Sequence, residues 1–280
     1  MNQYLRPTRL TEAFSALSSK PYVVLAGGTD FYPARVGRLI EEDVLDISRI
    51  DDLRGIREVA DADYWHIGAL VTWSELIQAA LPECFAGLKL AAREVGGLQI
   101  QNTGTLAGNV CNASPAADGV PALLALDAQV ELSGAQGVRS LPLADFLLAN
   151  RKTALASGEL LTGIKVPKWP AGTRSDFFKL GSRKYLVISI AMVSIVIAVD
   201  VSGAISRCGV AVGACSAVAR RLPALEKKLI GRRLTPDIAD LVAESDLAPL
   251  SPIADVRGTP EYRIDAVQTL LKRSLARIAI

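Results

Sequence analysis

The chain has 280 residues, 50% of them hydrophobic and 21% charged, with a formal net charge of +2. This length is enough for two or three modest subdomains with a buried core, and the near balance of charges argues against a nucleic-acid-binding surface. The N-terminus lacks the basic start and apolar core of a secretion signal, and the longest apolar run, residues 186–199, is too short to cross a bilayer. We therefore expect a cytoplasmic protein in which this run is a buried strand.

The first predicted subdomain comprises residues 1–57. An apolar run over 22–26 predicts a strand, and a glycine-rich loop and a helix over 32–40 follow it before a second short strand over 44–47. This order predicts a parallel sheet with a ligand at the carboxyl ends of its strands. The segment contains neither G-x-G-x-x-G nor a Walker-type G-x-x-x-x-G-K motif, so a Rossmann or P-loop nucleotide site is disfavoured.

The second predicted subdomain, residues 58–171, mixes strands and helices. Thr72 and Glu75 form a capping box that predicts the start of a helix. The other predicted elements, in chain order, are a strand at 65–68, a helix at 85–95, strands at 128–132 and 160–166, and a linker at 168–172.

The third predicted part, residues 172–280, begins with strands and ends with helices. Its strands are expected at 177–180, 188–199 and 204–212, with a turn at Ser202 and Gly203. Three helices are expected here. The first covers 224–230, the second begins after an N-cap at Thr235 with Pro236 as its first residue, and the third covers 261–278. Strands followed by helices predict an α+β protein with a three-stranded C-terminal sheet.

Two segments are rich in glycine and small polar residues, namely Ala26-Gly-Gly-Thr-Asp30 and Thr103–Asp118. The second has no hydrophobic period, so we expect an irregular loop rather than a helix or a strand. Glycines such as Gly104 and Gly108 allow a ligand to approach the backbone closely, and free backbone amides bind anions. Two separate anion-binding loops suit a ligand with two phosphates.

Residues 25–31, Leu-Ala-Gly-Gly-Thr-Asp-Phe, together with residues 105–118, resemble the FAD-binding subunit of the molybdenum hydroxylases, which include xanthine, carbon monoxide and nicotinate dehydrogenases. Ile67-Gly-Ala69, Tyr262-Arg263 and residues 270–273 resemble further parts of that family. The resemblance implies FAD and an α+β fold. That fold has two FAD-binding subdomains of the vanillyl-alcohol-oxidase/PCMH type, plus a C-terminal antiparallel sheet with a small helical bundle.

The backbone of the first loop is expected to hold the FAD pyrophosphate, with one threonine hydroxyl as a further donor. The expected binding residues there are Leu25, Ala26, Gly27, Gly28 and Thr29. Asp30 is expected to orient the loop by accepting N–H hydrogen bonds, because its charge would repel the phosphates. The alternative for the two glycines is an ordinary tight turn.

In the second segment, the resemblance implies that Thr105, Gly108 and Asn109 contact the flavin or its phosphates. It also implies that Cys111 and Asn112 face the middle region of the cofactor.

Three positions further along the chain complete the implied site. By resemblance, Asp118 binds a ribityl or ribose hydroxyl, although an Asp could equally cap a helix over 119–126. Leu161 matches an apolar residue packed against the flavin ring, and Lys179 matches a lysine near the ring edge that would stabilise reduced, anionic flavin. The alternatives are a strand core for Leu161 and a solvated strand residue for Lys179. Residues 185–189 are largely apolar where many relatives carry an acidic residue, which leaves the electron acceptor open.

The single histidine, His66, and the four cysteines show neither a CxxC pair nor metal-ligand spacing. We expect them to be structural, with the cysteines as free, buried thiols. The cysteines are Cys84, Cys111, Cys208 and Cys215. The sequence shows no metal site, no catalytic acid–base pair and no covalent flavin anchor.

These observations favour the FAD-carrying electron-transfer subunit of a molybdenum hydroxylase complex, an oxidoreductase. A molybdopterin-binding large subunit would oxidise the substrate, a small subunit with 2Fe-2S clusters would relay electrons, and FAD would pass them to NAD, quinone or oxygen. The first alternative is a self-sufficient FAD-dependent oxidase, for which the residues after Gly172 are too few to form a substrate cap. The second alternative is a cofactor-free binding module, which would not require intact glycine-rich loops.

Overall fold

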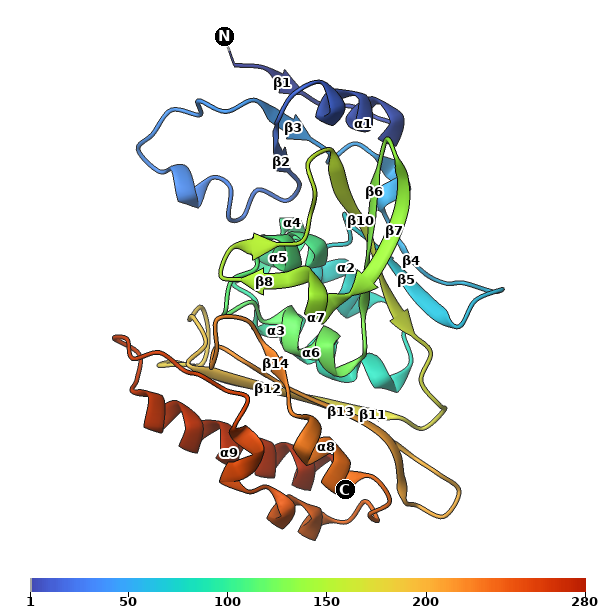
Figure 1. The fold of residues 1–280 in the computed structure, drawn as a ribbon, viewed down its shortest axis with the longest axis vertical. Coiled ribbons are helices and arrows are strands. Elements are labelled where there is room, and N and C mark those ends of the chain that lie inside the picture. Colours follow the sequence, from blue (N-terminus) through green and yellow to red (C-terminus); the bar gives the residue numbers. More distant parts are fainter. Residues whose placement is uncertain (1) are drawn as a thin grey trace.

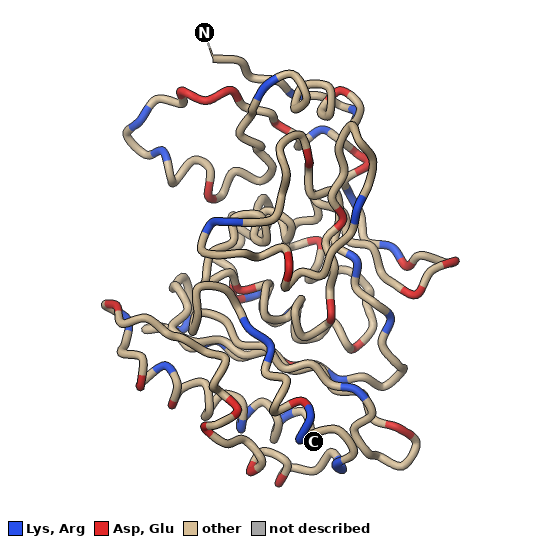
Figure 2. Tube along the Cα trace, in the orientation of Figure 1, with Lys and Arg blue, Asp and Glu red and all other residues tan. Residues whose placement is uncertain are grey.

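The computed structural model describes residues 2–280, which form an α+β protein with three larger sheets and one small hairpin (Figure 1). The N-terminal sheet lies at one end of the long axis, the central sheet and its helices follow, and the C-terminal sheet with its own helices lies at the other end. No helix within residues 2–280 is both long and apolar enough to span a bilayer. Basic and acidic residues are interspersed along the chain (Figure 2), which agrees with its formal net charge of +2.

The N-terminal sheet has the strand order β1–β3–β2, with β1 at Tyr4–Leu5, β2 at Val23–Leu25 and β3 at Val44–Asp46. Both pairings are parallel, which confirms the predicted parallel sheet. Helix α1 (Leu10–Ser19), which the sequence analysis did not predict, connects β1 to β2 and buries two of its residues in the main core.

The predicted helix over 32–40 is wrong. Only one 3₁₀ turn, η1 (Pro33–Arg35), forms there, and Gly37 follows in the left-handed region with φ of 74°. Val36 and Leu39 are more than four-fifths exposed, so no apolar face of this segment packs against the core. Most helices in proteins depend on such packing, and without it the segment forms a protruding loop (Figure 1).

The central sheet is antiparallel throughout and has the order β4–β5–β10–β6–β7. Its strands are β4 (Ile56–Glu58), β5 (Tyr64–Gly68), β6 (Gln129–Gly134), β7 (Gly137–Pro142) and β10 (Glu159–Pro167). The expected strands at 65–68, 128–132 and 160–166 are thus confirmed, while β4 and β7 were not predicted. Strand β7 is exposed along most of its length, which explains why it carries no hydrophobic signal.

Short helices lie between the central and C-terminal sheets. Helix α2 (Trp73–Gln78) begins with the predicted capping box, in which the Thr72 hydroxyl accepts from the Glu75 amide at 3.2 Å and the Thr72 amide donates to the Glu75 carboxylate at 2.7 Å. The expected helix at 85–95 is α3 (Ala86–Glu94). The other elements of this part are α4 (Leu98–Thr103), α5 (Leu106–Asn112), α6 (Gly119–Ala125), α7 (Leu143–Phe146), β8 (Leu147–Ala149) and β9 (Lys152–Thr153).

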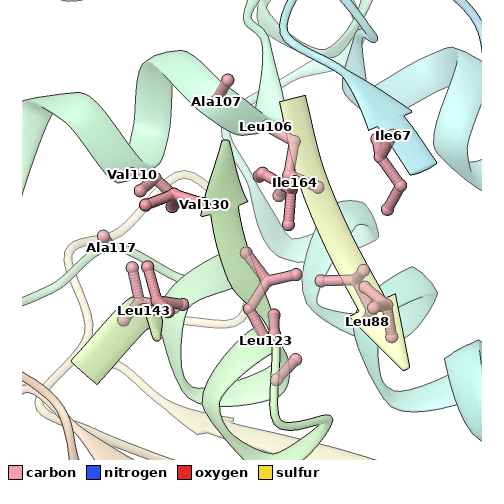
Figure 3. Close-up of a cluster of buried hydrophobic side chains, with 14 of the residues drawn as sticks. Ile67, Leu88, Leu106, Ala107, Val110, Ala117, Leu123, Val130, Leu143 and Ile164 are labelled. Carbon is pink, nitrogen blue, oxygen red and sulfur yellow. The ribbon is translucent and has the colours of Figure 1, made fainter. Parts of the chain in front are cut away.

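One core joins the central sheet to these helices (Figure 3). Ile67 on β5 and Ile164 on β10 face Leu88 of α3, Leu106 of α5 and Leu123 of α6, and all five are almost fully buried. Helix α5 therefore has an apolar side that packs on the sheet. The expectation that residues 103–118 form an irregular loop is therefore wrong for residues 106–112, whose few apolar residues lie on one side of a short helix. Residues 113–118 form no helix or strand, as expected.

The C-terminal sheet is an antiparallel meander of β11 (Arg174–Leu180), β12 (Ala191–Val199), β13 (Ile205–Gly213) and β14 (Arg220–Arg221). Helices α3 and α6 pack on one face, and α9 (Pro260–Ile278) packs on the other beside α8 (Pro223–Leu229) (Figure 1). Burial on both faces explains why eight of the nine residues of β12 are apolar, with Ser194 as the exception. The fourth strand, β14, adds to the three that were expected.

Three smaller expectations concern the C-terminal part and the cysteines. The turn at Ser202 and Gly203 is confirmed. The segment after Thr235 is a 3₁₀ helix, η4 (Pro236–Leu241), and Thr235 makes no side-chain cap to it; a second 3₁₀ helix, η5 (Glu244–Leu247), follows. All four cysteines are free, but Cys111, which lies in α5, is exposed and not buried as expected.

Candidate functional site

The two glycine-rich segments meet in space. A Cβ atom added to Gly27, in the loop after β2, would lie 2.0 Å from the carbonyl oxygen of Thr103 and 2.9 Å from the Cα of Gly104. A Cβ added to Gly104 would lie 3.2 Å from the Thr29 hydroxyl oxygen. The N-terminal sheet and the central part are therefore in backbone-to-backbone contact at one place, which only glycine permits.

The first loop presents free backbone donors at this contact. Within residues 2–280, no backbone carbonyl accepts a hydrogen bond from the amides of residues 26–30. Gly28 has φ of 72°, a left-handed conformation that turns the loop away from the carboxyl end of β2. Successive amides around a left-handed residue form a concave anion-binding nest, so this loop is suited to a phosphate group.

Asp30 does not orient this loop as expected. The residue is exposed, and within residues 2–280 its carboxylate accepts no hydrogen bond. Its backbone carbonyl accepts from the Ala34 amide at 3.2 Å instead. The η1 turn, and not the side chain of Asp30, therefore shapes the end of the loop.

The second segment uses several of its own donors internally. Thr105 is the N-cap of α5, and its hydroxyl accepts from the Gly108 amide at 2.9 Å, while its carbonyl accepts from the Asn109 amide at 3.1 Å. The side-chain oxygen of Asn109 accepts from the Gly119 amide at 3.3 Å. The amides of Gly108 and Asn109 are therefore not free to meet an anion, contrary to expectation.

Two residues near the end of α5 remain accessible. Cys111 is exposed, and the side-chain oxygen of Asn112 accepts from Arg151 Nη1 at 2.7 Å. Arg151 lies in the turn between β8 and β9 with φ of 55°, and its amide donates to the carbonyl of Ala113. This hairpin therefore holds the C-terminal end of α5 in place.

Asp118 and Lys179, separated by 61 residues, form a buried ion pair. Lys179 Nζ lies 2.8 Å from Asp118 Oδ2, and the side chain of Lys179 is only 5% exposed. The Ser189 hydroxyl donates to Asp118 Oδ1 at 2.7 Å, and Lys179 also donates to the carbonyl of Glu94 at 3.3 Å. The alternative for Lys179, a solvated strand residue, is therefore wrong. So is the alternative for Asp118, which precedes α6 but makes no side-chain cap.

Burial is the main influence on the charge of Asp118. It raises the pKa of this carboxyl group, and the opposing effects of the Lys179 ammonium and the Ser189 hydroxyl only partly offset the rise. Both carboxylate oxygens thus depend on donors from β11 and from the segment that leads into β12.

Leu161 lies in β10 and is 4% exposed within the main core. A β-bulge between Leu161 and Gly163 interrupts the pairing of β10 with β6. His66, on the neighbouring strand, occupies the space beside Gly163, where an added Cβ would lie 2.2 Å from its Nε2. His66 is buried and lies 3.6 Å from Glu131, which fits the structural role expected for it.

Ser189 and Arg151 also support this site and were not predicted from the sequence. Ser189 sits at the edge of an apolar run, where a lone serine gives no signal of its partner. Arg151 lies in an exposed turn, and its bond to Asn112 depends on a hairpin that was not predicted.

Comparison with known protein families gives two adjacent matches. Residues 1–169 match the family described as FAD binding domain in molybdopterin dehydrogenase. Residues 176–278 match the CO dehydrogenase flavoprotein C-terminal domain.

Individual relatives extend over nearly the whole chain. The nicotinate dehydrogenase FAD-subunit of Eubacterium barkeri is 30% identical over 97% of this chain and 94% of its own length. The glyceraldehyde dehydrogenase medium chain of Sulfolobus acidocaldarius is 30% identical over 99% and 98%. Among solved structures, the reconstituted CO dehydrogenase from Oligotropha carboxidovorans has a chain with a TM-score of 0.91 at 27% identity, which covers 100% of this chain and 98% of that one.

Proposed function

This chain belongs to the family of FAD-binding domains of molybdopterin dehydrogenases, and we propose that it transfers electrons from 2Fe-2S clusters to an external acceptor as the medium subunit of such a complex. Its cofactor is FAD, and its class is oxidoreductase. The expected fold, two FAD-binding subdomains with a C-terminal sheet and helices, is confirmed by the likeness to the CO dehydrogenase chains.

Medium subunits of this family work in multi-subunit complexes, so a large and a small subunit are partners of this chain. We assign the molybdopterin to the large partner and the 2Fe-2S clusters to the small one. The external acceptor would be NAD, quinone or oxygen. A cytoplasmic location remains a prediction from the sequence.

The observation that carries the proposed site is the set of amides at residues 26–30 that have no backbone acceptor within residues 2–280, in a loop whose Gly27 lies against the backbone of Thr103 and Gly104. A Cβ at Gly27 would force the two segments apart. Amides without a backbone acceptor suit a ligand that needs direct backbone donors. The pyrophosphate of FAD is such a ligand. When bound, FAD supplies the redox chemistry through its isoalloxazine ring, and the protein binds and orients it.

Side chains would hold the rest of the cofactor. We assign Asp118 to a ribityl or ribose hydroxyl and Lys179 to the neighbourhood of the ring, because these two residues form one buried, charged cluster. Leu161 would pack against the ring from the core of β10. On the face of α5 away from the core, Cys111 and Asn112 would meet the middle of FAD.

Thr105, Gly108 and Asn109 are assigned a different role from the one first expected. The Thr105 hydroxyl accepts a hydrogen bond from the Gly108 amide, and the Thr105 carbonyl accepts one from the Asn109 amide. These residues would therefore shape the start of α5 beside the ligand, and their amides would not donate hydrogen bonds to it. We further propose that residues 1–57 and 58–171 enclose FAD and that 172–280 form the C-terminal domain.

Rapid-mixing kinetics on the full chain tests the proposed electron transfer. The FAD of the isolated chain should be reduced by dithionite and reoxidised by an added acceptor, but not reduced by organic substrates. Addition of the molybdopterin and 2Fe-2S subunits should make flavin reduction depend on substrate. Rapid reduction of the isolated chain by an organic substrate would overturn the proposal in favour of a self-sufficient oxidase.

A further inference from the structure

Arg263, in the first turn of α9, is a buried arginine whose side-chain hydrogen bonds all reach residues outside its own helix. The residue is 2% exposed. Its Nη1 donates to the carbonyl of Ile190 at 2.5 Å and to that of Ala214 at 3.1 Å, and its Nη2 lies 2.7 Å from Asp255 Oδ1. One guanidinium thus binds two chain segments that follow β11 and β13, with Asp255 as its counter-charge.

Both segments continue directly into the Asp118 cluster. Ile190 follows Ser189, whose hydroxyl donates to Asp118 Oδ1 at 2.7 Å. The amide of Ala214 donates to the carbonyl of Pro115 at 2.9 Å, in the turn that leads from α5 to Asp118. Two separate paths therefore connect the guanidinium of Arg263 to the same carboxylate.

The second partner of that carboxylate is also connected. The amide of Ile190 donates to the carbonyl of Leu180 at 2.7 Å, and Leu180 directly follows Lys179 on β11. Ile190 is therefore held on one side by Arg263 and on the other by the strand that carries Lys179. A displacement of Ile190 would change the positions of both donors to Asp118, namely Ser189 and Lys179.

The backbone at Ala214 needs such support. Ala214 has φ of 62°, in the left-handed region that is unfavourable for a residue with a Cβ. Its carbonyl is held by Arg263 and its amide by Pro115, so bonds on both sides maintain this conformation. The arrangement also leaves Arg263 Nε buried without a partner among the described residues. The guanidinium is thus placed to reach the two carbonyls at the expense of one of its own hydrogen bonds.

We propose that Arg263 is a positioning residue for the flavin site, which holds the carbonyls of Ile190 and Ala214 so that Ser189 and Lys179 meet Asp118. This inference rests on the proposed function, because it takes Asp118 and Lys179 as FAD-binding residues. A lysine could not replace it, since an ammonium is a point charge and lacks the planar fork that reaches two carbonyls and a carboxylate together.

The test compares Arg263→Met with Lys228→Met in the full chain, stripped of flavin and reconstituted with FAD. Lys228 is a suitable control because its Nζ lies 2.7 Å from Asp246, which is buried in the same C-terminal part, and it makes no ion pair with the Asp118 cluster. Arg263→Met should weaken FAD binding about tenfold or more, and it should alter the visible circular dichroism and the reduction potential of the bound flavin. Lys228→Met should lower the melting temperature but leave all three flavin properties unchanged.

Further variants separate positioning from simple loss of stability. Arg263→Lys keeps the charge but should recover FAD affinity only in part, and Ser189→Ala combined with Arg263→Met should have less than the sum of the two single effects. If Arg263→Met does not fold, Arg263→Lys and Asp255→Asn take its place, and their FAD affinity and flavin spectra are compared with those of Lys228→Met. Equal FAD affinity and flavin spectra in the Arg263 and Lys228 variants, or strictly additive effects, would overturn the inference. Failure of the wild-type chain to bind FAD would instead overturn the proposed function.

Discussion

The two glycine-rich segments have similar compositions, but their backbone amides differ in their hydrogen bonds. The amides of residues 26–30 have no backbone partner within residues 2–280, whereas Thr105 occupies the amides of Gly108 and Asn109 at the start of α5. The first segment is thus an open set of donors and the second a folded support that presents side chains. Glycine content alone does not distinguish these two cases, but the hydrogen-bond acceptor of each backbone amide does.

The largest expected effect comes from breaking the contact between the two segments. Gly27→Ala would place a methyl group 2.0 Å from the Thr103 carbonyl, and because the neighbouring atoms are backbone on both sides, the segments must separate. We expect loss of detectable FAD binding, measured by fluorescence titration. Gly37→Ala is the matched control: Gly37 is left-handed, but no atom lies within 4 Å of an added Cβ. If both variants bind FAD like the wild type, the contact at Gly27 is not part of the site.

The next largest effect concerns the buried ion pair. Lys179→Met leaves the Asp118 carboxylate buried without its cation, which should lower the free energy of unfolding by about 3–5 kcal/mol near neutral pH. Asp118→Asn added to Lys179→Met should recover most of the loss, because no unpaired charge then remains. Chemical denaturation of the single and double variants measures this. A double variant no more stable than Lys179→Met would contradict the assignment of the loss to charge burial.

The pH dependence of the Lys179→Met variant has a definite sign. Burial already raises the pKa of Asp118, and loss of the Lys179 cation should raise it further. A carboxyl group with a raised pKa in the folded state contributes stability below its unfolded pKa and loses it as pH rises through the folded pKa. The stability deficit of Lys179→Met should therefore shrink as pH falls. A deficit that stays constant from neutral to acidic pH would show that lost packing, and not charge, causes it.

The smallest expected effect lies in the second segment. Thr105→Val removes the cap of α5 and should lower stability by roughly 1 kcal/mol. We expect only a modest change in FAD affinity, because the proposed site assigns no ligand contact to the Gly108 amide. Thr105→Ser keeps the hydroxyl and should be close to wild type in both respects. Thermal melts and FAD titration of the two variants provide the comparison. A complete loss of FAD binding in Thr105→Val alone would show that the threonine hydroxyl contacts the cofactor directly.

Much of the fold could be predicted because its signals are local. The run of β12, the capping box at Thr72 and the helix at 261–278 each contain their own pattern, and each is present. The helix expected at 32–40 failed because its apolar residues have no surface to pack on. Helix α5 was missed because it is short. Its few core residues, such as Leu106, do not repeat often enough to give a helical hydrophobic pattern in the sequence.

The site could be predicted less completely, because its contacts join distant parts of the chain. Asp118 and Lys179 were each identified from resemblance, but their mutual ion pair depends on how β11 packs on α3 while α6 packs on β12 and β13. Ser189 and Arg263 act only through such tertiary contacts. A single sequence contains no local pattern that pairs a serine before β12 with a carboxylate before α6.

We propose that the first loop binds the pyrophosphate of FAD through its backbone amides. The most direct measurement is the affinity of the flavin-free chain for FAD and for FMN, followed by identification of the flavin that acid releases from the chain as purified. The account predicts intact, noncovalently bound FAD and FMN binding weaker by about a hundredfold or more, since FMN lacks the second phosphate. Equal affinities, released FMN, or a flavin that stays with the denatured protein would contradict it.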